Sequence, residues 1–306
     1  MKSQDNEAFD AIIVGGSFAG IAAGLQLARA RRRILVVDSG QPRNRFAAHS
    51  HGFFGRDGAS PHDMLEEARD QLRRYPTVEW REEAAVDGQG EVDQFAIMTS
   101  TGQEFSARRI ILAYGVKDHL PDVPGLSDLW GRQAFHCPYC HGYEFSGKPL
   151  GILGDASRLA HMAPLLWEWS NDLAVFMLPD QPEFEDAVKG LLQKYSIPVH
   201  HSPVQRIERE EDDSVIFCLQ NGEAVSRAGL LVATTPEPSS DLAFRLGCEH
   251  QEVFGSDYVI ADERGATSVG GVYVAGDLMQ PRATISAAVA SGAAAGAACH
   301  QSLVFD

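Results

Sequence analysis

The chain of 306 residues, 44% of them hydrophobic, is long enough to bury two moderate cores, so we expect two domains. Its 42 acidic and 26 basic residues give a formal net charge of −16, which argues against nucleic acid and anionic membrane surfaces as partners. Five cysteines are too few for a disulfide-stabilised scaffold of this size.

The N-terminal segment, Met1 to Asp10, is polar and acidic. It lacks the apolar region of a signal peptide, so we expect a cytoplasmic protein. The longest run of small apolar residues, Ile285 to Ala298, is too short to span a bilayer and predicts a tightly packed helix instead.

The first motif has the order of a βαβ dinucleotide-binding unit. Apolar runs at Ala11 to Val14 and Ile34 to Val37 predict strands, and the pattern from Ile21 to Arg31 predicts the helix between them. The turn before the helix reads Gly-Gly-Ser-Phe-Ala-Gly, and the second strand ends in Asp38. In such units the backbone N–H groups of the turn bind a pyrophosphate and the acid binds a ribose hydroxyl.

The turn departs from the G-x-G-x-x-G pattern at one position, where Ser17 replaces the second glycine. Serine is small enough to let the ligand approach closely. The candidate cofactor-binding residues of this unit are Gly15, Gly16, Ser17, Ala19, Gly20, Asp38 and Ser39.

Two later strand-like runs end in short motifs typical of two-dinucleotide flavoproteins. The run Arg109 to Ala113 leads into Ala113-Tyr114-Gly115, and the run Gly271 to Ala275 leads into Gly276-Asp277. They resemble the Ala-Thr-Gly turn and the terminal Gly-Asp motif of those proteins, which implies that the first unit binds FAD. The further candidate residues are Ala113, Gly115, Gly276 and Asp277.

A Cys-x-x-Cys pair lies between these motifs, in the segment His136-Cys137-Pro138-Tyr139-Cys140-His141. Two thiols at this spacing can close a reversible disulfide, and a helix start with a nearby imidazolium favours the thiolate. Half of a zinc site and an incidental pair are the alternatives. The other cysteines, Cys218, Cys248 and Cys299, are single, so we expect redox chemistry and no metal.

A second nucleotide-binding pattern follows, but it is degraded. Strands are predicted at Leu150 to Gly154 and Leu173 to Leu178, with a helix at Ser157 to Ser170 between them. Ala156 and Leu159 replace the second and third glycines of the fingerprint, and Asp155 brings negative charge towards a pyrophosphate. The segment after Leu178 lacks the arginines that a 2′-phosphate needs, which makes NADPH doubtful.

Over almost its whole length the chain resembles the low-molecular-weight thioredoxin reductase family. The resemblance rests on the motifs already quoted and on Arg282-Ala283 after Gly276-Asp277. The run Cys-Pro-Tyr-Cys-His-Gly-Tyr-Glu from Cys137 to Glu144, with His51-Gly52-Phe53 ahead of Arg56-Asp57-Gly58, looks most like the branch of gliotoxin- and holomycin-type dithiol oxidases. His141 stands where the reductases usually carry an aspartate.

The resemblance implies an α/β fold with two Rossmann-like domains of the three-layer ββα type. We expect a discontinuous FAD domain at residues 1–117 and 243–306, and an inserted NAD(P)H-binding-like domain at 118–242 that carries the Cys-x-x-Cys. A homodimer is expected as well.

The same resemblance implies roles for individual residues. Cys140 would lie against the flavin, Cys137 would exchange with the substrate, and His141 or His136 would carry the proton. The residues expected near the flavin are His51, Arg282, Ala283 and Thr284, with Ala283 beginning a helix.

We therefore expect an FAD-dependent enzyme that oxidises a dithiol, either a small molecule or a thioredoxin-like protein, with oxygen as acceptor and without NADPH. An NADPH-dependent thioredoxin reductase is the alternative enzyme. A flavin-binding redox sensor that does not turn over is the alternative of another class.

Overall fold

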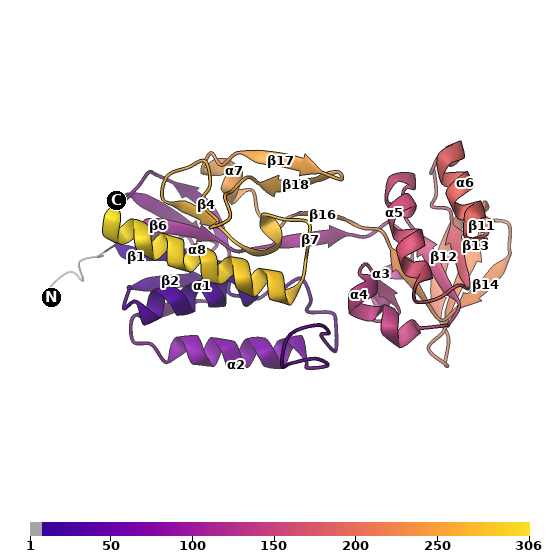
Figure 1. The fold of residues 1–306 in the computed structure, drawn as a ribbon, viewed down its shortest axis with the longest axis horizontal. Helices are drawn as coiled ribbons and strands as arrows, with labels where there is room; N and C mark the ends of the chain where they lie inside the picture. The colour runs from indigo at the N-terminus through magenta and orange to yellow at the C-terminus, as the bar shows by residue number, and fades with distance from the viewer. Residues whose placement is uncertain (1–7) are drawn as a thin grey trace. The chain divides into compact units, whose positions relative to one another are not determined.

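The computed structural model describes residues 8–306, and the chain divides into two compact units (Figure 1). Unit 1 comprises Met1–Arg45, Pro61–Lys117 and Pro236–Asp306, and unit 2 comprises Phe46–Ser60 and Asp118–Thr235. Residues 1–7 lie outside the described part. They make up most of the polar segment Met1 to Asp10, from which we expected a cytoplasmic protein.

The boundaries of the units differ from the expected domain ranges at two places. The chain returns to unit 1 at residue 236 rather than 243, because β16 (Thr235–Pro238) pairs with β7 (Val116–His119). Residues 46–60 group with unit 2 rather than with the FAD domain, because Phe46 packs against Gly131 and His51 faces Glu144.

The centre of unit 1 is a seven-stranded sheet in the order β3-β2-β1-β6-β5-β4, with β19 also paired to β6. Its strands β1, β2, β3, β6 and β19 pair in parallel, and β4 and β5 add an antiparallel edge. The strands are β1 (Phe9–Val14), β2 (Ile34–Val37), β3 (Val78–Arg81), β4 (Ala85–Gln89), β5 (Phe95–Thr99), β6 (Glu104–Leu112) and β19 (Val272–Val274).

Successive residues of β1 face opposite sides of this sheet, and each side has its own core. Ala11 and Ile13 pack towards three helices, which are α1 (Phe18–Arg29), α2 (Pro61–Arg73) and α8 (Ile285–Phe305). Ile12 and Val14 pack with residues of α7 (Leu242–Arg245) and of the hairpin β17 (His250–Val253) and β18 (Ser256–Val259). Figure 1 shows these layers, which are the three-layer fold that the sequence predicted.

The run of small residues near the C-terminus is explained by the packing of α8 on α1. A Cβ atom at Gly292 would overlap the Ala19 backbone, and one at Gly296 would lie 2.5 Å from the Ala23 carbonyl oxygen. The two helix backbones can therefore approach closely only because these positions are glycine. Within residues 8–306, no helix combines the length and apolar character needed to cross a membrane.

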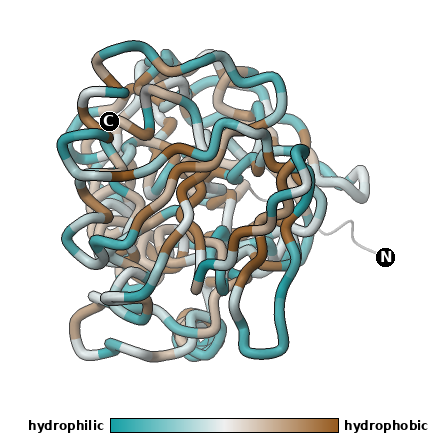
Figure 2. The backbone as a smooth tube through the Cα atoms, turned by 90° about the vertical axis from the view of Figure 1, so that its right-hand side faces the viewer, coloured by the Kyte–Doolittle hydropathy of each residue, from teal (hydrophilic) through white to brown (hydrophobic). Residues whose placement is uncertain are grey.

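Unit 2 is built on a five-stranded parallel sheet in the order β11-β10-β9-β15-β8. Its elements are β8 (Ala134–Phe135), β9 (Leu150–Leu153), α5 (Ala156–Trp167), β10 (Leu173–Phe176), α6 (Asp186–Lys194), β11 (Val199–His200) and β15 (Gly229–Val232). Helices α5 and α6 cover one face of the sheet. In Figure 2 the strands are largely hydrophobic and the outer loops hydrophilic.

A three-stranded antiparallel sheet covers the other face, where Ile207 and Phe217 pack with Phe176. It consists of β12 (Val204–Arg209), β13 (Val215–Leu219) and β14 (Ala224–Arg227), while α3 (Leu126–Leu129) packs nearby. The helix predicted to run to Ser170 ends at Trp167 instead. The chain turns there because Glu168, Trp169 and Ser170 bond back to Leu165 and Leu166 and then lead into β10.

Candidate functional site

The turn between β1 and α1 has no room for side chains at its glycines. A Cβ at Gly15, where φ is +105°, would overlap the Ala113 carbonyl, and one at Gly20 would overlap the Gly15 carbonyl. Ser17 begins α1 without a side-chain hydrogen bond to the first turn. The backbone N–H groups of that turn are therefore left for a ligand, as an anion-binding helix N-terminus requires.

The three glycine-containing motifs of unit 1 meet at one edge of the sheet. Strands β1, β6 and β19 are parallel, so their carboxyl ends lie together. Gly15 contacts Ala113 after β6, and Gly276 after β19 approaches the Ala19 side chain. Gly115, with φ of +68°, accepts a hydrogen bond from the Ser239 N–H through its carbonyl oxygen.

Asp38 directly follows β2, and its carboxylate is buried and held in place. Its Oδ2 accepts a hydrogen bond from Arg69 Nη2 at 2.9 Å. The Arg69 guanidinium lies over the Trp80 ring, 5.4 Å from its centroid, and that ring leaves no room for a Cβ at Gly16. Neither Arg69 nor Trp80 was predicted, because both follow the motif by many residues; Ser39, which was, is exposed.

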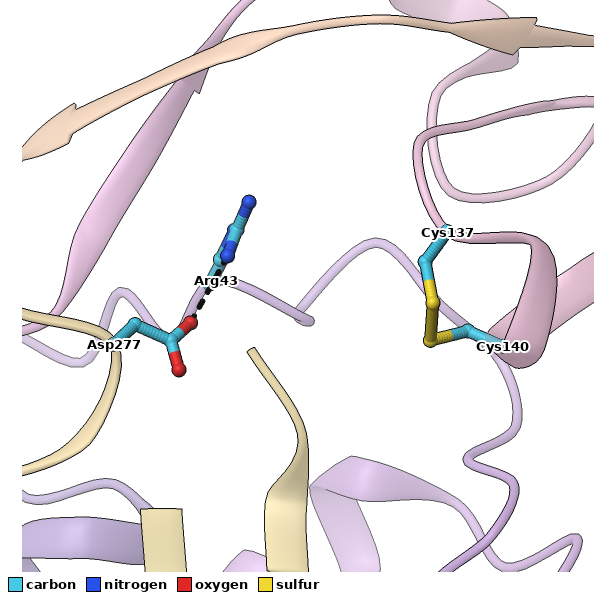
Figure 3. Close-up of a disulfide and its surroundings, with 4 residues drawn as sticks. All are labelled: Arg43, Cys137, Cys140 and Asp277. Carbon is cyan, nitrogen blue, oxygen red and sulfur yellow. Dashed lines mark hydrogen bonds and ion pairs between the residues drawn. A yellow bond between two sulfur atoms is a disulfide. The ribbon is translucent and has the colours of Figure 1, made fainter. Parts of the chain in front are cut away.

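Asp277 forms an ion pair that the sequence did not predict. Its Oδ2 accepts from Arg43 Nη1 at 3.0 Å, and both side chains are less than one-fifth exposed (Figure 3). The preceding Gly276 has φ of +79°, and its N–H donates to Ser291 Oγ on α8. The pair connects the loop after β2 with the start of the last segment of unit 1.

The helix expected to begin at Ala283 begins at Ile285. Thr284 is extended, with φ −132° and ψ 152°, and its Oγ1 accepts from the Ala287 N–H at 3.1 Å. This is the geometry of an N-cap, so Thr284 ends the preceding loop. Arg282 is exposed in that loop, and the Ala283 N–H donates to the Pro281 carbonyl.

The cysteine pair in unit 2 is a disulfide at the start of a short helix, α4 (Pro138–His141) (Figure 3). Strand β8 leads into it, Cys137 precedes the helix, and the two Cα atoms are 5.3 Å apart. The N–H groups of Cys140 and His141 both donate to the Cys137 carbonyl. A disulfide can be opened by the attack of a thiolate on one of its sulfur atoms.

His141 is the histidine that the structure places in an apolar setting. Its ring stacks on Phe135 with centroids 5.7 Å apart, and its Nδ1 is buried without a hydrogen-bond partner. Burial lowers the pKa of His141 below its ordinary value, the nearby His51 charge lowers it further, and Glu144 opposes both. The imidazole is therefore neutral at neutral pH and can accept a proton. His136 stacks on Trp130 instead, also at 5.7 Å.

His51 lies in the 46–60 loop and faces two carboxylates. Its Nε2 is 3.4 Å from Glu144 Oε1, and its Nδ1 is 3.6 Å from Asp57 Oδ1. Glu144 follows His141 by three residues in the 3-10 helix η1 (Gly142–Phe145). From the sequence, we expected His51 near the cofactor and gave Glu144 no role. Their pairing was not predicted because it joins segments about ninety positions apart. A cofactor contact of His51 stays a prediction.

Two of the remaining cysteines, Cys248 and Cys299, are buried. Burial raises the pKa of the Cys299 thiol to about 12 and also raises that of Cys248. Both thiols therefore stay protonated at neutral pH, while Cys218 lies on β13. Among residues 8–306, no group of three or more His, Cys, Asp and Glu side chains is arranged to hold a metal ion.

Comparison with known proteins assigns the chain to a family. The pyridine nucleotide-disulphide oxidoreductase family matches residues 9–292. The chain belongs to this family. A curated relative from Leptosphaeria maculans, called thioredoxin reductase sirT, is 30% identical, with 94% of this chain and 92% of the relative covered. The resemblance to thioredoxin reductases is confirmed, and the protein is a flavoprotein disulfide oxidoreductase.

Two solved structures support the same assignment. The crystal structure of an oxidoreductase from Agrobacterium tumefaciens is 38% identical, with a TM-score of 0.89, and covers 97% of this chain and 99% of that one. The crystal structure of HlmI is 36% identical, with a TM-score of 0.91, and covers 99% of this chain and 95% of that one.

The residues of unit 1 fit FAD, the cofactor of this oxidoreductase. A cradle without Cβ atoms at Gly15 and Gly20, beside an uncapped helix N-terminus, suits a pyrophosphate. Asp38 lies where a ribose hydroxyl is expected. The Asp277 carboxylate, held by Arg43, is the acceptor available to the ribityl region.

The nucleotide-type turn of unit 2 is closed by its own side chains. Asp155 caps α5 by accepting from the Arg158 N–H at 3.0 Å, and Leu159 is completely buried. Gln181 bridges the two loops that a nucleotide would contact: its Nε2 donates to the Gly154 carbonyl, and its Oε1 accepts from the Leu178 N–H. In this part of the oxidoreductase, hydrogen bonds of Gln181 therefore join the two loops that follow β9 and β10.

Proposed function

We propose that this oxidoreductase oxidises a dithiol substrate to a disulfide at Cys137 and Cys140, with oxygen as the terminal acceptor and without NADPH. The observation that carries the proposal is the combination of a Cys137–Cys140 disulfide with the closed turn of unit 2. A redox pair that receives electrons from a nucleotide needs a working nucleotide site in the same chain. Here the cysteine pair is present, but Asp155 and Gln181 form hydrogen bonds with the loops where the nucleotide would bind.

The charges around the turn support the same proposal. The segment after β10 reads Leu178-Pro179-Asp180-Gln181 and offers no cation for a 2′-phosphate. Arg158 is close, but its Nε lies 3.7 Å from the Asp155 carboxylate. NADPH binding would need Arg158 to leave that carboxylate and Gln181 to release both loops.

The half-reaction at the cysteines balances without any other group. A substrate thiolate attacks the disulfide at Cys137, a mixed disulfide forms, and Cys140 leaves as the thiolate. The second substrate thiol, deprotonated, attacks the mixed disulfide, so substrate leaves as a disulfide and two electrons remain on the cysteine pair. His141, kept neutral by burial, accepts a thiol proton. FAD supplies the route by which the electron pair reaches oxygen, giving hydrogen peroxide.

An NADPH-dependent thioredoxin reductase is the second candidate, because several relatives carry that name, among them one from Arthroderma benhamiae that is 28% identical over 96% of this chain. For that activity the electrons would flow in the opposite direction, from the nucleotide to the cysteines. A small dithiol and a thioredoxin-like protein are both candidate substrates. The homodimer and the cytoplasmic location stay predictions.

The test is an anaerobic titration of the FAD-loaded protein with dithiothreitol, NADPH and NADH in turn, following the visible flavin band. We expect bleaching by dithiothreitol alone, and recovery of the band with one hydrogen peroxide per dithiol when air is admitted. Stoichiometric bleaching by NADPH would refute the proposal and identify a reductase. Failure of dithiothreitol to bleach the flavin would remove the exchange chemistry as well.

A further inference from the structure

We infer that His51 is a positioning residue for His141: held between Asp57 and Glu144, it engages the Glu144 carboxylate and sets how strongly that carboxylate acts on the base. The inference rests on the proposed role of His141 in the exchange reaction. His51 belongs to the 46–60 loop, far in the sequence from the cysteine pair, and it faces Glu144, which closely follows that pair.

The 46–60 loop is built to hold His51 in one place. The backbone of Ser50 is bonded on both sides, to Ala59 through its N–H and to Gly58 through its carbonyl, each at 2.8 Å. The Gly52 N–H donates to Asp57 Oδ1, also at 2.8 Å, so one carboxylate closes the loop and faces the His51 ring. The position of His51 is therefore fixed by backbone bonds on either side of it.

The three polar side chains Asp57, Glu144 and His51 differ in their exposure to solvent. Asp57 is the most exposed, followed by Glu144 and then His51, whose side chain is 30% exposed. The groups acting on His141 are Glu144, from its own segment, and His51, from the loop packed against it. The His141 ring also stacks on Phe135, which is apolar and in turn stacks on Phe145.

The two neighbours of His141 act in opposite directions, which makes the inference testable. Loss of His51 removes a group that lowers the pKa of His141 and frees Glu144 of a partner, and both changes favour the imidazolium of His141. Loss of the Glu144 charge favours the neutral ring. A purely structural disturbance would change solvent access in both variants and would not separate them by sign.

The experiment measures the pKa of His141 directly, by NMR titration of ring-labelled histidine in the FAD-loaded, oxidised protein, with the signal assigned from His141→Gln. We expect a wild-type value below the ordinary 6.5. His51→Gln should raise it and Glu144→Gln should lower it, each by roughly half a unit. The matched control is His62→Gln, which removes an exposed histidine from a similar contact with Asp63, 3.4 Å away on α2, and should leave the value unchanged.

Asp57→Asn provides a second variant should His51→Gln fail to fold. Asparagine keeps an oxygen for the Gly52 N–H but removes one of the two carboxylate charges that hold His51, so the pKa of His141 should rise by less than in His51→Gln. Equal pKa values in wild type, His51→Gln and Asp57→Asn would overturn the inference, as would shifts of the same sign in His51→Gln and Glu144→Gln.

Two further readouts separate this inference from its rivals. Loss of FAD from His51→Gln with an unchanged pKa of His141 would assign His51 to cofactor binding, as the sequence predicted. The NMR titration needs no turnover, so it tests His51 even where NADPH bleaches the wild-type flavin and the proposed function fails. Where the exchange reaction holds, the acid limb of flavin reduction by dithiothreitol should move with the pKa of His141 in each variant.

Discussion

Arg43 and Asp277 lie 234 positions apart in the sequence and form a 3.0 Å ion pair in unit 1 (Figure 3). Each side chain is mostly buried, so solvent screens the pair only in part. The carboxylate belongs to the Gly-Asp motif at the cofactor site, and the guanidinium comes from the loop after β2. The pair therefore joins two distant parts of the chain at the expected FAD site.

Replacing Arg43 with methionine should weaken FAD binding by at least roughly tenfold, because a mostly buried carboxylate loses a charged partner and its orientation. The measurement is the dissociation constant for FAD, obtained by adding FAD to the apoprotein and following the quenching of flavin fluorescence. Arg45→Met is the control, since Arg45 is an arginine of the same loop whose Nη1 donates to the nearby Pro42 carbonyl at 2.9 Å. Equal affinities in the two variants would contradict this role for Arg43.

The exchange reaction should depend on Cys137 and not on the cofactor site. Cys137→Ser should lower dithiol oxidation by at least about a thousandfold, because serine cannot form the mixed disulfide, while the FAD-to-protein ratio stays that of wild type. Peroxide production with dithiothreitol measures the first quantity and absorbance the second. Cys218→Ser is the control and should keep full activity; a Cys137→Ser variant that still produces peroxide from dithiol would rule out the cysteine pair as the exchange centre.

The sequence was sufficient for features that depend on short-range patterns. The βαβ unit, the Cys-x-x-Cys and the small-residue helix follow from short-range spacing, whereas the three-layer fold was expected from the family resemblance; the structure shows all of them.

The features that escaped prediction depend on contacts between distant segments. Arg43 pairs with Asp277, and Arg69 donates a hydrogen bond to Asp38. Gln181 donates a hydrogen bond to the Gly154 carbonyl in another loop. Each is a polar side chain in a loop or on a helix surface, where no periodicity marks its partner. The return to unit 1 at residue 236 was missed for the same reason, since it depends on the pairing of β16 with β7.

The pH dependence of the reductive half-reaction should have an acid limb set by His141. Burial, helped by His51, lowers the pKa of His141, so the ring is neutral above that pKa and gains a proton as the pH falls through it. Reduction of the flavin by dithiothreitol should therefore slow as the pH falls through the lowered pKa of His141, and at neutral pH and above it should change only with ionisation of the dithiol itself.

His141→Gln should remove this acid limb and slow reduction at neutral pH by about 10²-fold, the usual contribution of a positioned acid–base group. Stopped-flow absorbance across the pH range measures both effects. His136→Gln is the comparison, because His136 stacks on Trp130 and was the other candidate for the proton. If the acid limb disappears in His136→Gln and persists in His141→Gln, the assignment must be exchanged.

The close approach of α1 and α8 should make the protein sensitive to any side chain at their contact. In Gly292→Val, new atoms would overlap the Ala19 backbone, which cannot move away as a flexible side chain would. We expect a loss of several kcal/mol, about 3 or more, seen as a lower unfolding temperature. FAD should be released earlier on heating, because α1 begins at the turn that holds the pyrophosphate. Gly190→Ala on α6, where a Cβ meets no atom within 4 Å, is the control and should stabilise the protein by about 0.5–1 kcal/mol. If Gly292→Val unfolds at the wild-type temperature, the two helices do not depend on backbone contact at this position.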